Sequence, residues 1–139
     1  MAFIKAENLK HSFVRRDENG EAVAEVAALD GIDLEVEAGQ FIAVLGHNGS
    51  GKSTFARHLN VLLSPTEGAL WVDGKDVRDE DRLWEIRQTA GMIFQNPDNQ
   101  IVAGLVEEDV AFGPENIGVP TDEIWKRVED SLQAVGMTE

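Results

Sequence analysis

A glycine-rich stretch constrains the fold of this chain more than any other feature of its sequence. Residues 46–54 read Gly-His-Asn-Gly-Ser-Gly-Lys-Ser-Thr and fit the pattern G-x-x-x-x-G-K-[ST], in which a loop turns its backbone N–H groups toward the phosphates of a nucleotide. An apolar run of buried-strand type precedes the loop at residues 41–45, and apolar residues at helical spacing follow it. The stretch therefore predicts a strand, a phosphate-binding loop and a helix in that order, with an ordinary glycine turn between strand and helix as the alternative.

The residue types of this loop each have a chemical reason. Glycines allow the backbone to close around phosphates, because side chains there would block the approach of the anion. Lys52 adds a positive charge that can reach the β- and γ-phosphates, the Ser53 hydroxyl is placed to coordinate Mg²⁺, and the Thr54 hydroxyl is placed to reach the α-phosphate. The predicted nucleotide-binding residues of the loop are Gly46, His47, Asn48, Gly49, Ser50, Gly51, Lys52, Ser53 and Thr54.

Length and composition narrow the class of protein. The 139 residues, 42% of them hydrophobic, suffice for one small globular domain. A net charge of −14 argues against a nucleic-acid surface, which needs clustered Lys and Arg. No apolar run is long enough to cross a bilayer and the N-terminus lacks a signal-peptide pattern, so we expect a cytoplasmic protein. Because Cys is absent, the protein has no disulfides.

The residues before the loop predict β-structure. Strand patterns cover residues 3–6, 11–15 and 32–37, and Asn19-Gly20 marks a turn. Nucleoside monophosphate kinases and small GTPases usually carry such a loop on their first strand. A β-rich segment ahead of the loop therefore disfavours both classes.

The residues after the loop predict a hairpin, a short helix and a second buried strand. A strand at residues 69–72 followed by the tight turn Asp73-Gly74 indicates a hairpin, rather than an apolar strand that ends in a magnesium-binding aspartate. A short helix is predicted at residues 80–88, and a buried strand at residues 92–94.

The end of the sequence predicts one more helix. It has Thr121 as N-cap and Gly136 beyond its end. Its predicted apolar face consists of Ile124, Val128, Leu132 and Val135. Ahead of it, the acidic residues 107–109 are by themselves typical of a solvated helix start.

Several phrases of the sequence, together with the loop, resemble the ATP-binding subunit of energy-coupling-factor (ECF) importers, the cobalt and vitamin uptake group of ABC transporters. These phrases are His47 and the segments 57–60, 93–100 and 106–116. The resemblance covers nearly the whole chain and implies an α/β fold, the P-loop NTPase core of an ABC ATPase with an N-terminal antiparallel β subdomain, incomplete at the C-terminus. Within a partial ABC ATPase domain at 1–139, it implies a β subdomain at 1–40, a P-loop core at 41–95, and the Q-loop with the start of a helical subdomain at 96–139.

The resemblance also implies cofactors and catalytic roles. Gln95 would be the Q-loop glutamine, which touches Mg²⁺ and the attacking water and senses the membrane partner, whereas its residue type alone also fits a polar cap on a buried strand. The implied cofactors are ATP and Mg²⁺. Lys52 and Gln95 would be the catalytic residues, and Ser53 and Gln95 the metal-binding ones.

The partners implied by the resemblance belong to a membrane transporter. They are a second ECF-type ATPase subunit, a membrane coupling subunit and, indirectly, a substrate-binding membrane subunit. The coupling subunit would contact residues near 95–113, with Phe112 in the packing surface. The protein would lie peripherally on the inner face of the cell membrane. It would use ATP hydrolysis to energise uptake of a vitamin or a transition-metal ion.

The chain departs from the family pattern in two ways. The family usually stacks an aromatic residue of its second strand, often Tyr, on adenine, but this sequence has no Tyr. The matching position is Arg15, with Phe13 two residues earlier. Both residues are candidate base contacts. The sequence also ends before the family's signature motif, second Walker aspartate, catalytic glutamate and switch histidine. We therefore expect the chain alone not to hydrolyse ATP.

Two other functions stay open from the sequence. A phosphotransferase of the nucleotide-kinase type would explain the loop, although the Arg-rich lid of such enzymes is missing. A nucleotide-binding module without turnover would explain it equally well. A metal role for His11, His47 and His58 is not expected, because they show no metal-ligand spacing.

Overall fold

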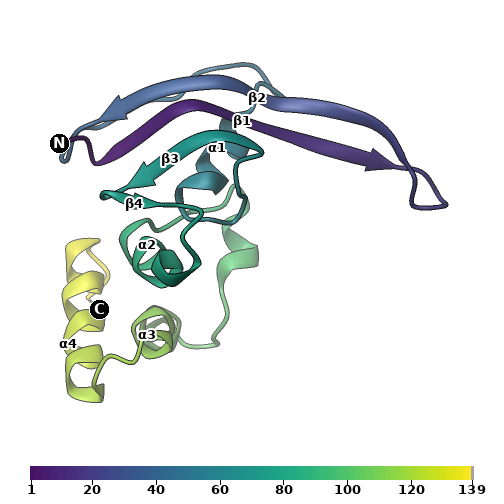
Figure 1. Cartoon of the computed structure of the whole chain (residues 1–139). Helices are drawn as coiled ribbons and strands as arrows, with labels where there is room; N and C mark the ends of the chain where they lie inside the picture. Colours follow the sequence, from purple (N-terminus) through teal and green to yellow (C-terminus); the bar gives the residue numbers. More distant parts are fainter. Residues whose placement is uncertain (139) are drawn as a thin grey trace. The chain divides into compact units, whose positions relative to one another are not determined.

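The computed structural model describes residues 1–138. The chain divides into two compact units, Met1–Met92 and Ile93–Glu139, which we call the sheet unit and the helical unit. The subdomain boundaries expected after residues 40 and 95 stay predictions. The elements, labelled in Figure 1, are β1 (Ile4–Arg16), β2 (Ala22–Val36), α1 (Lys52–Leu59), β3 (Glu67–Val72), β4 (Lys75–Asp76), the 3₁₀ helix η1 (Glu80–Arg82), α2 (Leu83–Thr89), the 3₁₀ helix η2 (Pro97–Gln100), α3 (Val106–Asn116) and α4 (Thr121–Ala134).

The sheet unit is built on one antiparallel sheet with the strand order β2-β1-β3-β4. β1 and β2 pair over their whole lengths, from Ile4 opposite Val36 to Arg16 opposite Ala22, and the predicted turn lies between them with Gly20 at φ 83°. The three short strands expected before the loop are thus parts of two long ones. Beyond the last pairing with β3, β1 and β2 continue as a two-stranded ribbon, residues 12–16 and 22–27 (Figure 1).

One apolar core holds the helices against this sheet. Leu9 of β1, Leu70 of β3 and Ile86 of α2 have no exposed surface, and Phe55 of α1 is 9% exposed. Burial of each such side chain stabilises the fold by roughly 1.5–3 kcal/mol.

The predicted hairpin at Asp73-Gly74 is confirmed, since β3 pairs with β4 on either side of that turn.

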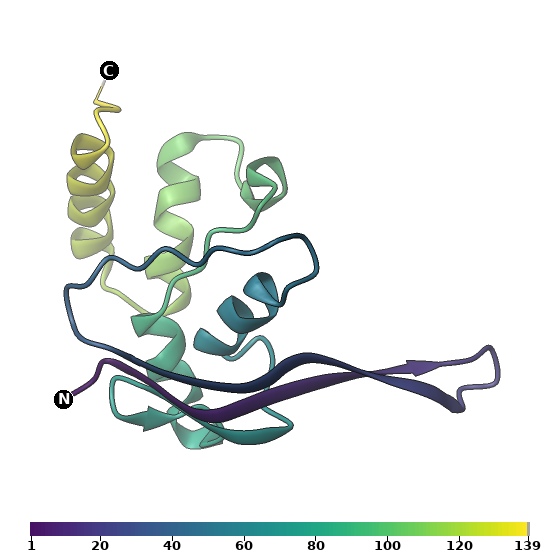
Figure 2. The same ribbon diagram turned by 90° about the horizontal axis from the view of Figure 1, so that it is seen from above.

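The strand predicted at residues 41–45 is wrong in this structure. The segment between β2 and α1 is an irregular loop (Figure 2), in which Phe41 is 96% and Leu45 90% exposed. The strand predicted at residues 92–94 is wrong as well, and Ile93 is 92% exposed. The physical reason is shared: a strand needs a neighbour for its backbone N–H and C=O groups, and the sheet of this structure pairs neither segment.

The helical unit consists of η2, α3 and α4 with a small core of its own. Ala111 of α3 packs with Ile124 and Val128 of α4. The helix predicted at the end of the sequence is confirmed as α4, but its N-cap is Pro120 rather than Thr121. Val135 lies past the helix end and is 68% exposed, so it does not belong to the apolar face as expected.

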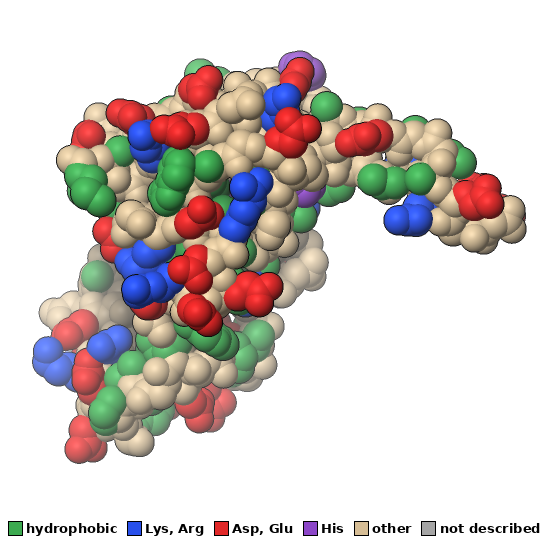
Figure 3. All heavy atoms as spheres, in the orientation of Figure 1, with side chains coloured by type: hydrophobic (Ala, Val, Ile, Leu, Met, Phe, Trp, Pro, Cys, Tyr) green, Lys and Arg blue, Asp and Glu red, His purple; other side chains and the backbone are tan. Residues whose placement is uncertain are grey.

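The surface drawn in Figure 3 mixes charges of both signs. Asp and Glu side chains are spread over the face shown, with Lys and Arg scattered among them. Over the part of the chain that the structure describes, no helix is long and apolar enough to cross a membrane.

Candidate functional site

The glycine-rich loop closes at positions that only glycine fits well. Gly49 and Gly51 have φ values of 82° and 96°, the left-handed region in which a side chain is strained. A Cβ on Gly46 would lie 2.5 Å from Ser50 Oγ, and a Cβ on Gly51 would lie 2.5 Å from the backbone oxygen of Ala28 in β2. The loop is therefore tightly folded on itself and seated directly against β2.

The first turn of α1 leaves its backbone N–H groups without a side-chain cap among the described residues. Gly51 is the N-cap, and the first backbone bond is donated by Phe55 N–H to Gly51 O at 2.8 Å. The amides at 52–54 precede this bond, so the helix itself offers them no partner. Together with the positive end of the helix dipole, they form a site that suits an anion such as a phosphate.

Lys52 lies across the loop. Its Nζ donates to Gly46 O at 2.6 Å, to His47 O at 2.8 Å and to Ser50 Oγ at 3.2 Å. The ammonium is thus held by the loop that leads into α1, and it adds a full positive charge to the partial charges of the helix N-terminus.

The residues present fit a nucleotide phosphate with its magnesium ion. Ser53 is exposed in the first turn of α1, directly after Lys52 in the sequence. Mg²⁺ keeps several waters and takes few protein oxygen ligands when a phosphate binds it as well. Among residues 1–138, no group of three or more His, Asp or Glu side chains is arranged to hold a metal ion by itself.

The two candidate base contacts lie on the ribbon of β1 and β2, beyond the place where the loop meets β2. Gly51 contacts β2 at Ala28, beside the pairing of Leu29 with His11. Two residues further along β1, Phe13 is 41% exposed and packs edge-on against the His11 ring at 4.6 Å. Arg15 follows on the same face of β1, because side chains two residues apart share a face and the register has no shift between them.

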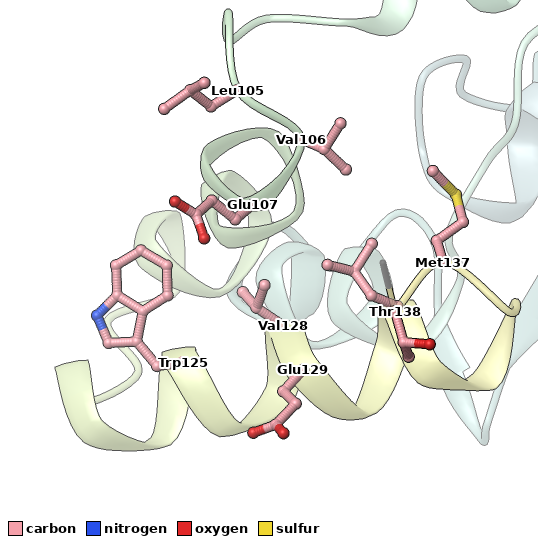
Figure 4. A pocket seen from close by; sticks show the side chains of 9 residues that line it. Leu105, Val106, Glu107, Trp125, Val128, Glu129, Met137 and Thr138 are labelled. Carbon is pink, nitrogen blue, oxygen red and sulfur yellow. The ribbon is translucent and has the colours of Figure 1, made fainter.

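Gln95 belongs to the helical unit, whereas the loop belongs to the sheet unit. Gln95 is exposed just before η2. In the same unit a cavity of about 600 Å³ lies between α3 and α4 (Figure 4). Its lining is apolar except for Glu107, Glu129 and Thr138, and part of it comes from Leu105 and Val106, inside the 95–113 segment expected to face a membrane partner.

Sequence spacing missed one close pair of polar side chains. His11 and His58 are both buried, and His58 Nε2 lies 3.3 Å from His11 Nδ1. His58 Nδ1 also lies 2.7 Å from Thr54 O in the first turn of α1. The two residues are far apart in the sequence, and only the packing of α1 on β1 brings them together.

The chain belongs to the ABC transporter family, as residues 29–139 match the sequence profile of the family of that description. The Energy-coupling factor transporter ATP-binding protein EcfA1 of Symbiobacterium thermophilum is 58% identical over 137 residues, which are 99% of this chain and 47% of that protein. The Cobalt import ATP-binding protein CbiO of Syntrophus aciditrophicus is 50% identical over 113 residues, 81% of this chain and 40% of that protein. The predicted resemblance to ECF ATP-binding subunits is confirmed, and this chain spans about half the length of the curated relatives it matches.

Solved structures place the fold in the same family. The structure of cbiO1 from Clostridium perfringens, described as part of the ABC transporter complex cbiONQ, has a TM-score of 0.79 and 34% identity, covering 98% of this chain and 51% of that one. The ATP-binding cassette MJ0796, in a dimeric post-hydrolysis state bound to ADP and Pi, has a TM-score of 0.74 and 26% identity, covering 94% of this chain and 56% of that one. The predicted ABC ATPase fold is confirmed, and family membership gives no support to a phosphotransferase of the nucleotide-kinase type.

Proposed function

We propose that this chain is the nucleotide-binding part of the ATP-binding subunit of an ECF-type importer, which uses ATP hydrolysis to energise uptake of a vitamin or a transition-metal ion. The observation that carries the proposal is a glycine-rich loop that leads into the uncapped N-terminus of α1 and holds the Lys52 ammonium on its Gly46 and His47 carbonyls. The names of the relatives support the transporter context.

The residues of the loop would divide the work of holding Mg-ATP. The backbone N–H groups of residues 46–54 would surround the phosphates, Lys52 would reach the β- and γ-phosphates, and Thr54 the α-phosphate. Ser53 and Gln95 would be ligands of Mg²⁺, which neutralises charge on the phosphate oxygens when bound. Phe13 and Arg15 would stack on the adenine face, since both an aromatic ring and a guanidinium can do so.

The proposed assembly follows the relatives' names. The subunit would work with a second ECF-type ATPase subunit and would lie peripherally on the inner face of the cell membrane. Residues near 95–113 would contact a membrane coupling subunit, which in turn holds the substrate-binding membrane subunit. In support, cbiO1 is described as part of a transporter complex, and several apolar side chains of this segment, Phe112 among them, are exposed.

The test is calorimetry of Mg-ATP binding to the full-length protein. Lys52→Ala removes a charge-assisted contact, so we expect affinity to fall by on the order of 2 kcal/mol, or about thirtyfold. Lys126→Ala is the matched control, because its ammonium lies on the exposed surface of α4 and pairs with Asp130. Equal affinities for wild type and Lys52→Ala would refute the proposed phosphate site.

A further inference from the structure

The segment around Gln95 is almost entirely exposed. Between residues 93 and 102, every residue is exposed except Gln100, which is half-buried at the end of η2. No strand pairs with this segment in the sheet of the structure. Something other than packing or a β-ladder must therefore hold the backbone on either side of Gln95.

The Gln100 side chain supplies those contacts. Its Oε1 accepts from Phe94 N–H at 2.9 Å, and its Nε2 donates to Phe94 O at 3.3 Å and to Asn96 O at 3.3 Å. One carboxamide thus satisfies both backbone groups of the residue before Gln95 and the carbonyl of the residue after it. It takes the place that a neighbouring strand would have.

Asp109 ties the next stretch of backbone to α3. Its Oδ1 accepts from Val102 N–H at 2.7 Å and from Ala103 N–H at 3.1 Å. A carboxylate that accepts two backbone N–H groups makes charge-assisted bonds, which are stronger than neutral ones. Asp109 lies in the first turn of α3, so this contact joins the helix to the end of the segment that Gln100 organises.

We infer that Gln100 and Asp109 are positioning residues for Gln95. Gln100 fixes the backbone on both sides of Gln95, and Asp109 anchors the following residues to α3, so that a displacement of α3 is passed along the chain to Gln95. The inference rests on the proposed function, in which Gln95 acts on the metal and the attacking water. Both side chains would act through Gln95 and not on the nucleotide itself, so both should affect turnover rather than nucleotide affinity.

The first experiment measures steady-state ATP hydrolysis by the full-length protein in its assembled transporter. Gln100→Ala should lower kcat by roughly ten- to a hundredfold, as expected when a reacting group loses its position, with the KM for ATP within about threefold of wild type. The matched control is Gln133→Ala, because Gln133 is an exposed glutamine of α4 outside the cavity. Unchanged kcat in Gln100→Ala would overturn the inference.

A double-mutant cycle separates positioning from a general loss of stability. If Gln100 acts through Gln95, then Gln100→Ala should lower kcat in the wild-type background and have no further effect in the Gln95→Ala background. Equal reductions in both backgrounds would overturn the inference, because the side chain would then act independently of Gln95.

Asp109 offers a conservative substitution that tests the hydrogen bonds themselves. In Asp109→Asn an amide oxygen can still accept from Val102 and Ala103, so kcat should stay near that of wild type, whereas Asp109→Ala should lower it. Equal losses of kcat in both variants would show that the charge of Asp109 matters rather than its hydrogen bonds to the backbone. That result would overturn the role inferred for Asp109. Failure of the wild-type transporter to hydrolyse Mg-ATP would instead refute the proposed function.

Discussion

At the scale of single residues, the buried histidine pair carries a defined proton arrangement. Since a carbonyl can only accept, His58 Nδ1 must donate to Thr54 O and His11 Nδ1 to Ser64 O, which lie at 2.7 and 2.9 Å. His58 Nε2 is then an acceptor that faces the N–H of His11. Protonation of His58 would place two N–H groups opposite each other, so the pair favours neutral His58.

This arrangement predicts that acid destabilises the fold. Burial lowers the pKa of His58 below its usual value, and the neighbouring His11 acts in the same direction, while the backbone carbonyls of Thr54 and Ser64 oppose the shift. The unfolded state therefore binds more protons, and stability is fully present above the unfolded pKa of about 6.5 and is lost as pH falls toward the folded pKa. Thermal unfolding of the full-length protein at pH 7.5 and 5.5 should show a lower melting temperature in acid.

Two variants show whether His58 is responsible. His58→Gln should narrow the difference in melting temperature between the two pH values, although it lowers stability at pH 7.5 by removing buried contacts. His47→Gln, at an exposed histidine of the loop, should keep the full difference. A His58→Gln variant with undiminished acid sensitivity would contradict the assignment.

At the scale of elements, the sequence predicted those units whose partners lie close along the chain. The hairpin of β3 and β4 and the helix from Thr121 were predicted, because turn residues and helical periodicity act locally. The loop 46–54 was predicted as well, since its pattern already contains the glycines and the lysine. The strands predicted at 41–45 and 92–94 were wrong, because apolar composition does not reveal whether a paired neighbour exists.

Contacts made across elements were equally beyond prediction. Three such contacts depend on how two segments pack or fold back. They are the approach of Gly51 to Ala28, the buried histidine pair, and the hydrogen bonds from the Gln100 side chain to the backbone on either side of Gln95. The sequence shows which residue types are present, but not which of them meet. Candidate residues could thus be predicted, but not the contacts that position them.

The ribbon of β1 and β2 yields a prediction about base recognition. Phe13→Ala in the full-length protein should weaken Mg-ATP binding by about 1–3 kcal/mol, the usual worth of an aromatic side chain stacked on a base. Binding of inorganic triphosphate, which has no base, should not change. Val23→Ala, at an exposed valine of the same ribbon, is the matched control.

Calorimetry with both ligands decides this prediction. Equal losses for ATP and triphosphate would show that Phe13 supports the loop rather than the base. A variant that binds ATP as wild type does would remove Phe13 from the site altogether.

At the scale of the whole molecule, the exposed apolar run 41–45 predicts self-association of this 139-residue chain. Its backbone is unpaired, and residues 42–45 line, with residues of β2 and α1, an open and largely apolar pocket of about 400 Å³. Light scattering should show oligomers, and a phosphate-release assay no hydrolysis above background. A monodisperse monomer that hydrolyses ATP would contradict both expectations.

Charged substitutions locate the contact. Phe41→Glu combined with Leu45→Glu should restore a monomer, because carboxylates are costly to bury between copies. Val23→Glu combined with Val135→Glu places the same charge at two other exposed apolar positions and should leave the oligomers in place.

The order of the strands along the chain bears on how the protein is made. All four strands lie between Ile4 and Asp76, and the longest pairing joins β1 and β2 across a short turn. Contacts between segments near in sequence form fast, and synthesis delivers the N-terminal residues first. β1 and β2 can thus pair before residues 46–54 have emerged, so that Gly51 meets a β2 strand already in place and the nucleotide loop takes its shape against that hairpin.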